Sequence, residues 1–349
     1  MRLANLRIVR HIGNISSNLM LLANFLKLAI ELQEWAMEKI DVVCLCDLYN
    51  LKDFFGEHFA ADNPWINLLL PQEVSNPESI EHALAFSPGL NAFEPYPNLR
   101  LVSCAGAGVD ALLDNPSLNT NVEVSRVIID EQAQMIAGFA IWYIHGWQRR
   151  MWEYTTLQSA KNWHPINRTP PSKFPVGILG FGKIGGTLAR TLQALGYPVT
   201  AFGSKDRVEG DLTVLSGSQG LMELAKNSQA IINLLPLTKD TREILAAEFF
   251  SNMREDAILI HLGRGAHLVD EDLIKALDQG RPAIAALDVF MDEPLPTEHP
   301  FWEHEKIMLT PHVAGDADFR AIAQFIADGV AQFEKGNLPE GIVDRDRGY

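Results

Sequence analysis

Residues 176–186 read VGILGFGKIGG, and this stretch decides the fold. An apolar run ends in three glycines at G-x-G-x-x-G spacing, and a helical pattern follows over residues 187–195. In such a unit Gly180 allows the tight turn, Gly182 lets the backbone approach a pyrophosphate, and Gly185 lets helix and strand pack closely. The helix N-terminus adds unpaired N–H groups and the positive end of the helix dipole. The stretch therefore predicts a strand–turn–helix unit that binds a dinucleotide. We prefer this interpretation to a strand–turn–helix unit without a ligand.

Alternating strands and helices continue after this unit. Strands are expected at 176–180, 198–202, 230–235, 257–262, 283–289 and 307–310, and helices at 183–195, 221–226, 239–249 and 271–278. Asp270 is expected to cap the last of these helices and Gly280 to end it. Six strands that alternate with helices predict a Rossmann-type, doubly wound parallel sheet.

The N-terminal third has the pattern of a second, smaller α/β unit. Strands are expected at 41–46, 82–86 and 99–103, and the last of them runs into a glycine-rich turn at 105–110. That turn could present backbone N–H groups to an anion, or it could simply be a tight turn before a helix. A final helix at 318–335 is expected to return to this unit.

The expected fold class is therefore α/β with two domains. Residues 1–112, completed by 318–349, would form a flavodoxin-like open α/β substrate domain. Residues 113–317 would form the dinucleotide-binding domain.

The N-terminus allows two interpretations. Four basic residues precede the first acidic one, and residues 19–30 are largely apolar, as in a signal or transit peptide. A strand at 6–12, a cap at Ser17 and a helix at 19–37 would instead lead into the strand at 41–46 and complete a βαβ unit. We favour the folded interpretation, because polar residues interrupt the apolar run and no A-x-A cleavage site follows it.

Composition limits the classes of binding partner and the cellular compartment that we expect. The formal net charge of −15 argues against nucleic acid or an anionic membrane surface as a partner. No apolar segment is long enough to span a bilayer. The three cysteines, Cys44, Cys46 and Cys104, show no CxxC pairing, so neither a disulfide framework nor a metal site is expected. We expect a soluble protein of the cytoplasm, whose partner is a small molecule.

A long helix expected at 130–151 is rich in aromatic residues. Trp142, Tyr143 and Trp147 lie on it, and Trp152 follows directly. So many aromatic side chains suggest a face buried against another domain or subunit, with packing inside one subunit as the alternative. On this basis we expect a homodimer.

The residues after the strand at 198–202 bear on the choice of cofactor. NAD-preferring folds carry an acidic residue about 20 positions past the glycines, where it binds the ribose 2′-OH. Here Gly203 stands at that position, and Ser204, Lys205, Asp206 and Arg207 follow. A hydroxyl and two cations suit a 2′-phosphate, whereas Asp206 would repel it if it pointed inward. We expect NADP as cofactor, with NAD possible.

An ordered series of short motifs follows the later strands. They are LLPLT at 234–238, GRG at 263–265, LDVFMDEPLP at 287–296 and TPHVAG at 310–315. With the glycine motif, the series resembles the D-isomer-specific 2-hydroxyacid dehydrogenases, and most of all their glyoxylate/hydroxypyruvate reductase A branch, whose ending is similar to VDRDRGY at 343–349. The resemblance extends from about residue 83 to the C-terminus.

The resemblance implies a catalytic trio of Arg264, Glu293 and His312. Arg264 would hold a 2-oxoacid carboxylate through its charged, planar fork and help to polarise the ketone. His312 would donate a proton to the carbonyl oxygen as hydride arrives from the nicotinamide, and Glu293 would favour the imidazolium form of His312. Because each of the three follows a strand of one sheet, all three should project to the same edge.

Further contacts are implied in the same way. The backbone N–H groups of Ala107 and Gly108 would cradle the substrate carboxylate, Phe86 would lie beside the substrate, and Asp288 would contact the nicotinamide carboxamide. The other expected cofactor-binding residues are Gly180, Gly182, Lys183, Ile184, Gly185, Ser204, Lys205, Arg207, Leu235, Pro236 and Leu262.

The chain departs from the family pattern at three positions. His261 stands where the family usually has Asn, and Ala317 stands where Thr or Ser is common. Phe86 replaces the tryptophan of the branch and lacks its indole N–H. Substrate preference therefore cannot be copied from the branch.

The function implied is NADPH-dependent reduction of a small 2-oxoacid, such as glyoxylate or hydroxypyruvate, to the D-2-hydroxyacid. One alternative is an NAD-dependent dehydrogenase of another substrate; a formate dehydrogenase is disfavoured, because those enzymes carry Gln where Glu293 stands. Another is a dinucleotide-sensing interaction protein similar to the family's corepressors, which can retain Arg264, Glu293 and His312.

Overall fold

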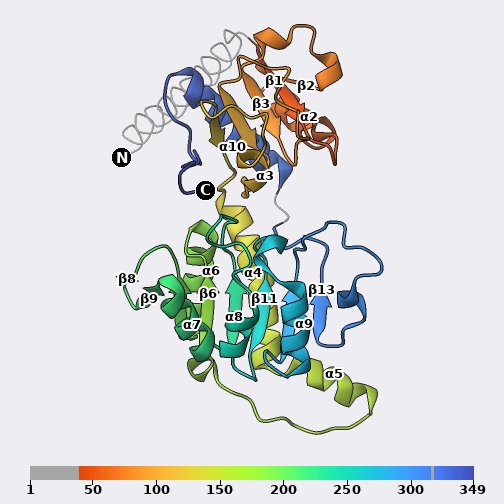
Figure 1. Ribbon diagram of the computed structural model, residues 1–349, viewed down its shortest axis with the longest axis vertical. Coiled ribbons are helices and arrows are strands. Elements are labelled where there is room, and N and C mark those ends of the chain that lie inside the picture. Colours follow the sequence, from red (N-terminus) through yellow and green to blue (C-terminus); the bar gives the residue numbers. More distant parts are fainter. Residues whose placement is uncertain (1–38, 316–317) are drawn as a thin grey trace, which may run out of the picture.

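The computed structural model describes residues 39–315 and 318–349, which form two α/β lobes, each built on its own sheet (Figure 1). The elements expected at 6–12 and 19–37, the cap at Ser17 and the departure at Ala317 lie outside the described residues. Within the described ranges, no helix combines the length and the apolar character needed to cross a membrane.

Among the described residues, the smaller lobe holds a parallel five-stranded sheet in the order β2-β1-β3-β4-β5. Its strands are β1 (Ile40–Leu45), β2 (Ile66–Leu69), β3 (His82–Ala85), β4 (Leu101–Cys104) and β5 (Glu123–Ser125), and its helices are α2 (Leu51–Asp62), α3 (Asp110–Leu113), η1 (Pro71–Glu73) and η2 (Pro77–Ser79). This is the flavodoxin-like order, so the expected fold of this lobe is confirmed.

The C-terminal helix packs on this smaller sheet. Helix α10 (Phe319–Glu334) lies beside α2 in Figure 1, and its Ile322, Ile326 and Val330 join the buried cluster around Val42. Strand β5 pairs with β4, although it follows the boundary expected at residue 112. The chain therefore leaves the smaller sheet only after β5.

The larger lobe holds an eight-stranded sheet in the order β13-β12-β11-β10-β6-β7-β9-β8. Its strands are β6 (Val176–Leu179), β7 (Val199–Phe202), β8 (Arg207–Glu209), β9 (Leu212–Leu215), β10 (Ala230–Asn233), β11 (Ile258–His261), β12 (Ile284–Leu287) and β13 (Ile307–Leu309). All neighbours are parallel except the edge pair β8–β9. The six expected strands are confirmed. The short, largely exposed β8 carries too little apolar pattern to be expected, whereas β9 was missed although Leu212 and Val214 alternate as buried apolar residues.

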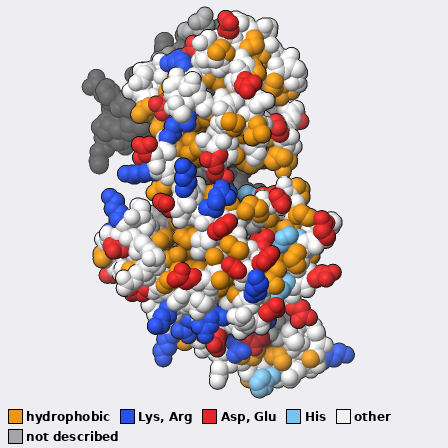
Figure 2. Space-filling view, in the orientation of Figure 1, with side chains coloured by type: hydrophobic (Ala, Val, Ile, Leu, Met, Phe, Trp, Pro, Cys, Tyr) orange, Lys and Arg blue, Asp and Glu red, His pale blue; other side chains and the backbone are white. Residues whose placement is uncertain are grey.

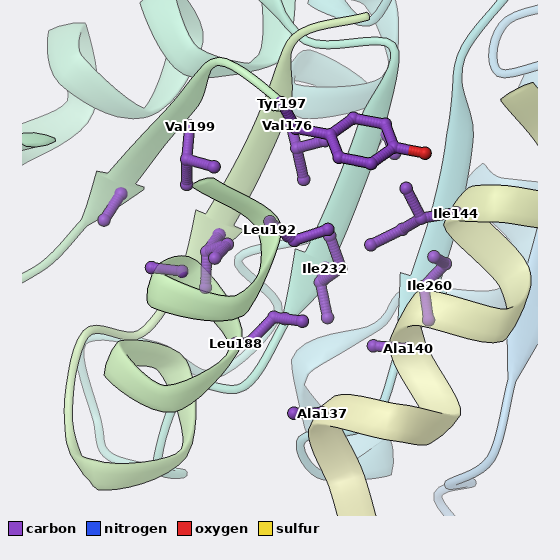
Figure 3. Packing of buried hydrophobic residues seen from close by; sticks show 14 of the residues in the cluster. Ala137, Ala140, Ile144, Val176, Leu188, Leu192, Tyr197, Val199, Ile232 and Ile260 are labelled. Atoms are coloured by element: carbon purple, nitrogen blue, oxygen red, sulfur yellow. The ribbon is translucent and has the colours of Figure 1, made fainter. Parts of the chain in front are cut away.

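Helices cover both faces of the larger sheet. They are α4 (Asp130–Gln148), α5 (Met151–Ser159), α6 (Lys183–Ala194), α7 (Gly217–Asn227), α8 (Ala247–Asn252) and α9 (Asp270–Asp278), with η3 (Pro171–Lys173), η4 (Gly265–His267) and η5 (Pro300–Glu303). On one face, Ala137 and Ala140 of α4 and Leu188 of α6 pack over Ile232 and Ile260 (Figure 3). The small alanine side chains let α4 lie close to this face of the sheet.

Two helix predictions were wrong. The helix expected at 239–249 begins only at Ala247, because the preceding backbone pairs with the loop after β11: Leu245 N donates to His267 O and Val269 N donates to Leu245 O. Asp270 is the first residue of α9 rather than its cap, and its carboxylate lies 3.3 Å from His299 Nε2.

The structure confirms one expected helix end and corrects another. Gly280 has φ +81° and follows the last turn of α9, which confirms its role at the helix end. The helix expected at 130–151 divides at Arg150, whose backbone is left-handed at φ 59°, so that α4 and α5 are separate.

Candidate active site

The three side chains of the expected catalytic trio stand on three successive loops. Arg264 follows β11, Glu293 follows β12 and His312 follows β13. These strands are parallel neighbours, so their carboxyl ends lie at one edge of the sheet. Figure 1 shows this edge turned toward the smaller lobe.

Glu293 and His312 form a hydrogen-bonded pair. Nδ1 of His312 lies 2.7 Å from Oε2 of Glu293, and Oε1 of Glu293 accepts from the Phe290 N–H at 2.9 Å. Partial burial alone would raise the pKa of Glu293, but the hydrogen bonds from His312 and Phe290, with the charges of His312 and Arg264, hold that pKa below its ordinary value. Glu293 is thus an anionic partner for His312.

Asp288 fixes the loop that carries His312. This side chain is 1% exposed; its Oδ1 accepts from Thr310 Oγ1 at 2.6 Å and from Val313 N at 3.0 Å, and its Oδ2 accepts from Ala314 N at 3.0 Å. The carboxylate therefore ties the end of β12 to the residues on both sides of His312. Its contact with a nicotinamide carboxamide stays a prediction, and such a contact would share oxygens already in use.

Arg264 joins the two lobes. Its Nε lies 3.0 Å from Oδ1 of Asp110, and its Nη1 donates to the Gly263 carbonyl at 2.8 Å. Its guanidinium rests on Gly108, where an added Cβ would lie 1.3 Å from Nη2. Two of the three guanidinium nitrogens are thus held by the protein, and Nη2 points at the glycine-rich turn.

That turn, residues 105–108, is secured from behind. The Ala107 carbonyl accepts from Arg126 Nη1 at 3.3 Å, and the Gly108 carbonyl accepts from Cys104 Sγ at 3.2 Å. In the described part of the chain, the N–H groups of Ala107 and Gly108 have no acceptor. The Phe86 ring lies 3.4 Å from where a Cβ on Gly106 would be. The turn therefore has two N–H groups free for an anion next to Arg264 Nη2.

The arginine loop also packs onto the glutamate loop. A Cβ on Gly265 would lie 1.9 Å from the Phe290 carbonyl carbon, so only glycine fits there. Contacts thus run without a break from Gly108 through Arg264, Gly265 and Phe290 to the Glu293–His312 pair. The structure brings the trio and the turn together.

The glycine motif has the expected geometry at two positions. Gly180 has φ +100°, and a Cβ there would lie 2.7 Å from the Leu234 carbonyl oxygen. A Cβ on Gly185 would lie 2.0 Å from the Gly180 oxygen, which confirms the close packing of helix on strand. A Cβ on Gly182 would meet nothing within 4 Å, so space is open before the first turn of α6. That opening suits the pyrophosphate of a dinucleotide.

The residues expected near a 2′-phosphate lie after β7. Ser204 and Lys205 are exposed, and Arg207 is half-buried with its guanidinium 5.3 Å above the centroid of the Phe181 ring in the glycine motif. The Arg207 Nε lies 2.7 Å from Glu209 Oε1. Asp206 accepts from Ser216 Oγ at 2.9 Å, so its carboxylate is directed to that hydroxyl.

The remaining expected cofactor residues surround the same strand ends. Ile184 lies in the first turn of α6, and Lys183 Nζ forms a 2.5 Å ion pair with Asp130 Oδ1. Leu235 is buried, and Pro236 and Leu262 are half-buried, just past β10 and β11. Figure 2 shows that Lys and Arg side chains gather where the two lobes meet, although the chain as a whole is acidic.

Four residues next to the site were given no role at the level of sequence, although His261 was noted as a departure from the family pattern. Asp110 ends the glycine-rich stretch. Its position just after the expected anion-binding turn was the signal that could have drawn attention to it. Asn233, His261 and His267 form a buried cluster under Arg264; polar residues that close apolar strands were the signal for the first two. Burial, with neighbouring positive charge, lowers the pKa of His261 to about 3 and that of His267 to about 4.

Comparison with known proteins identifies the family. Residues 141–314 match the model of the "D-isomer specific 2-hydroxyacid dehydrogenase, NAD binding domain" family. A curated glyoxylate/hydroxypyruvate reductase A from Serratia proteamaculans is 35% identical over 274 residues, which cover 77% of this chain and 88% of the relative. The chain belongs to the D-isomer-specific 2-hydroxyacid dehydrogenases. The family's NAD(P)-dependent oxidoreductase activity is thereby assigned to this dehydrogenase.

Solved structures of this dehydrogenase family share the fold. One, from Xanthobacter autotrophicus Py2 and in complex with NADPH and MES, superposes with a TM-score of 0.83 at 29% identity, over 89% of this chain and 100% of that one. An NADPH-dependent glyoxylate/hydroxypyruvate reductase from Sinorhizobium meliloti, in complex with NADP and sulfate, superposes with a TM-score of 0.82 at 28% identity, over the same shares. The two-lobed architecture is therefore that of the dehydrogenase family.

Proposed function

We propose that this dehydrogenase reduces a small 2-oxoacid, such as glyoxylate or hydroxypyruvate, with NADPH, and that His312 is the general acid. Where the product has a stereocentre, it would be the D-2-hydroxyacid. The observation that carries the proposal is the 2.7 Å Glu293–His312 pair at the end of a continuous path of contacts from Arg264 and Gly108. The proposed proton donor and the proposed anion-binding group would thus lie at one edge of the sheet.

The substrate carboxylate would bind between the lobes. Nη2 of Arg264 and the N–H groups of Ala107 and Gly108 offer charge-assisted donors to its two oxygens. Binding there would orient the 2-oxo group toward the edge that holds His312. His312 would then give its proton to the carbonyl oxygen, and the anionic Glu293 would stabilise the imidazolium before transfer.

NADPH would supply the hydride when bound. The open space at Gly182 and the N-terminus of α6 fit its pyrophosphate, while Ser204, Lys205 and Arg207 would hold the 2′-phosphate. The Xanthobacter structure is a complex with NADPH and the Sinorhizobium structure a complex with NADP, which supports this choice. The hydrogen bond from Ser216 removes the main objection to a phosphate, because it turns the Asp206 carboxylate to a partner of its own.

A panel of 2-oxoacids assayed with NADPH and NADH side by side tests the proposal. Oxidation of NADPH with glyoxylate or hydroxypyruvate, several-fold faster than oxidation of NADH, is the expected result. Turnover confined to other 2-oxoacids or to NADH would overturn the substrate or the cofactor assignment. NADPH binding without turnover of any 2-oxoacid would instead favour a dinucleotide-sensing protein.

We further propose a homodimer in the cytoplasm. Exposed apolar side chains on α4 and α5, among them Trp142 at 63% and Met151 at 53% exposure, support a subunit contact on these helices. The three free cysteines, of which Cys44 and Cys104 are buried, suit a reducing compartment. Light scattering during gel filtration would show a single species of twice the chain mass, and a monomer would contradict the dimer.

A further inference from the structure

A buried polar network lies directly beneath Arg264, and the proposed reaction does not use it. Asn233 closes β10, His261 closes β11, and His267 closes the short helix η4 after Arg264. All three side chains are 0% exposed. Buried polar side chains that hydrogen-bond one another hold each other in place, although His261 Nε2 has no hydrogen-bond partner among the described residues.

Asn233 is fully used as the centre of the network. Its Nδ2 lies 3.2 Å from His261 Nδ1 and 3.1 Å from His267 Nδ1, and its Oδ1 accepts from Leu235 N at 3.2 Å. The amide has two N–H hydrogens, so it can donate to both rings. Each histidine therefore presents an unprotonated Nδ1 to Asn233.

The donors around His267 determine its protonation. Its Nδ1 faces a second donor, the Arg264 N–H at 3.1 Å, so the ring proton must sit on Nε2. That nitrogen lies 3.2 Å from the Pro236 carbonyl oxygen, to which it donates. A charged ring would turn an N–H against two donors, and the lowered pKa of His267 agrees with a neutral ring.

We propose that His267 is a positioning residue that couples the carboxylate-binding arginine to the cofactor loop. One edge of its ring holds the backbone of Arg264, and the opposite edge holds Pro236. The inference rests on the proposed function in one respect, since it takes Arg264 as the group that binds a 2-oxoacid and the loop at Pro236 as a cofactor contact.

The loop packs so closely that movement of the ring would reach Arg264. A Cβ on Gly263 would lie 2.9 Å from His267 Nδ1 and 3.0 Å from Asn233 Nδ2. The carbonyl of the same Gly263 accepts from Arg264 Nη1 at 2.8 Å. The His267 ring therefore positions the Arg264 backbone directly, through the hydrogen bond to its N–H, and the guanidinium indirectly, through Gly263.

Two substitutions separate the two edges of the ring. In His267→Asn the Oδ1 atom can replace Nδ1 and keep the Arg264 contact, but nothing reaches Pro236. In His267→Gln the Nε2 atom can replace the ring Nε2 and keep the Pro236 contact, but the acceptor for Arg264 is lost. A lost hydrogen bond of this kind corresponds to about a five- to tenfold change in binding.

The experiment measures the KM for glyoxylate at saturating NADPH and the Kd of NADPH from quenching of tryptophan fluorescence. We expect His267→Gln to raise the glyoxylate KM about five- to tenfold with the NADPH Kd unchanged, and His267→Asn to do the reverse. Both variants should keep kcat within a few-fold, because neither touches His312 or Glu293. A shift of both constants by the same factor in both variants, or of neither constant, would overturn the inference.

Matched controls address loss of the fold. His299 also bonds through both ring nitrogens, to Phe301 N at 3.3 Å and to Asp270 at 3.3 Å, but it lies outside the network. His299→Asn and His299→Gln should therefore alter the urea midpoint without separating KM from Kd. If neither His267 variant folds, Gly263→Ala serves instead, since its Cβ would press on the His267 ring. The displaced ring also holds Pro236, so both the glyoxylate KM and the NADPH Kd should rise, and a rise in only one of them or in neither would overturn the inference.

Failure of the proposed function gives a different result. If the wild type reduces no 2-oxoacid, the proposed function fails. The coupling of His267 to Pro236 is then tested by the NADPH Kd alone. Weaker NADPH binding by His267→Asn but not by His267→Gln would still support the coupling to Pro236, and equal binding by both would overturn it.

Discussion

Oε2 of Glu293 lies 2.7 Å from Nδ1 of His312, although the two residues belong to the loops of different strands. The Phe290 N–H orients the other carboxylate oxygen, and Asp288 holds the backbone on the far side of His312. The ring is thus aligned from its Nδ1 side, which leaves Nε2 as the nitrogen that can give a proton to substrate. His312 itself has φ 54°, a conformation that this surrounding network must maintain.

Replacing Glu293 by Gln should impair turnover more than binding. The amide keeps a similar shape but removes the negative charge that favours the imidazolium form of His312, so we expect kcat to fall about 10- to 100-fold. Steady-state kinetics with glyoxylate and NADPH measures kcat and KM separately. Glu271→Gln, exposed on α9, is the control, and an unchanged kcat in Glu293→Gln would contradict the assigned role.

The same carboxylate predicts a pH dependence of stability. Because the folded pKa of Glu293 lies below its unfolded value, its contribution is present above the unfolded pKa of about 4.3 and is lost as the pH falls through the folded pKa. The group is partly exposed, so solvent screening limits the contribution to about 1 kcal/mol or less. Urea unfolding from pH 6 to pH 3 should show wild type and Glu293→Gln converging as the pH falls. A gap that widens toward low pH would have the wrong sign.

Arg264→Lys should weaken 2-oxoacid binding although the charge is kept. Lysine cannot bond Asp110 and the Gly263 carbonyl and at the same time present a planar fork to the substrate. Loss of a charge-assisted hydrogen bond costs about 1.5–3 kcal/mol, which corresponds to a KM for glyoxylate raised about 10- to 150-fold. Arg320→Lys is the matched control, because Arg320 makes a two-bond pair with Asp62 on the smaller lobe. Equal KM values for Arg264→Lys and wild type would argue against a carboxylate at this position.

The sequence was sufficient to predict the parallel strands and the edge to which Arg264, Glu293 and His312 project. Buried apolar strands and glycine turns are features of local sequence. The rule that ligand-binding loops follow the carboxyl ends of parallel strands then predicts the edge of the sheet at which the three residues lie. The helix expected at 239–249 shows the limit of local pattern. Its residues carry helical spacing, but backbone pairing of Leu245 with the segment after β11 outweighs that preference.

Contacts between distant segments were beyond local reasoning. The ion pair of Asp110 with Arg264 joins residues 154 positions apart, and Asn233 meets His267 across 34 positions. Neither pair has a spacing signature, because the fold alone determines which loops face one another. Sequence reasoning therefore selected Arg264, Glu293 and His312, whose roles stay predictions, and missed contacts such as those of Asp110 and Asn233 that hold this region together.

Removing both cations after β7 should separate the two nicotinamide cofactors. Lys205→Ala with Arg207→Ala would delete the positive charges expected at the 2′-phosphate, so the KM for NADPH should rise about 10- to 100-fold while that for NADH changes less than threefold. The Phe181 ring under Arg207 remains in place, and the glycine turn should be undisturbed. Lys275→Ala with Arg281→Ala is the control, because it removes an exposed and a half-buried cation of the same lobe. Equal changes in both KM values would contradict the 2′-phosphate assignment.

Gly182→Ala should weaken cofactor binding without harming the fold. An added Cβ meets no protein atom within 4 Å, and Gly182 has φ −101°, which alanine tolerates, so the free energy of unfolding should change by about 1 kcal/mol or less. The methyl group would occupy the space before the N-terminus of α6, where we expect the pyrophosphate, and the Kd of NADPH should rise at least about tenfold. Gly138→Ala on α4, where a Cβ also meets nothing within 4 Å, is the matched control and should leave the Kd unchanged. Since both substitutions add the same methyl group to open space, a Kd that responds to neither would show that the cofactor does not approach the backbone at Gly182.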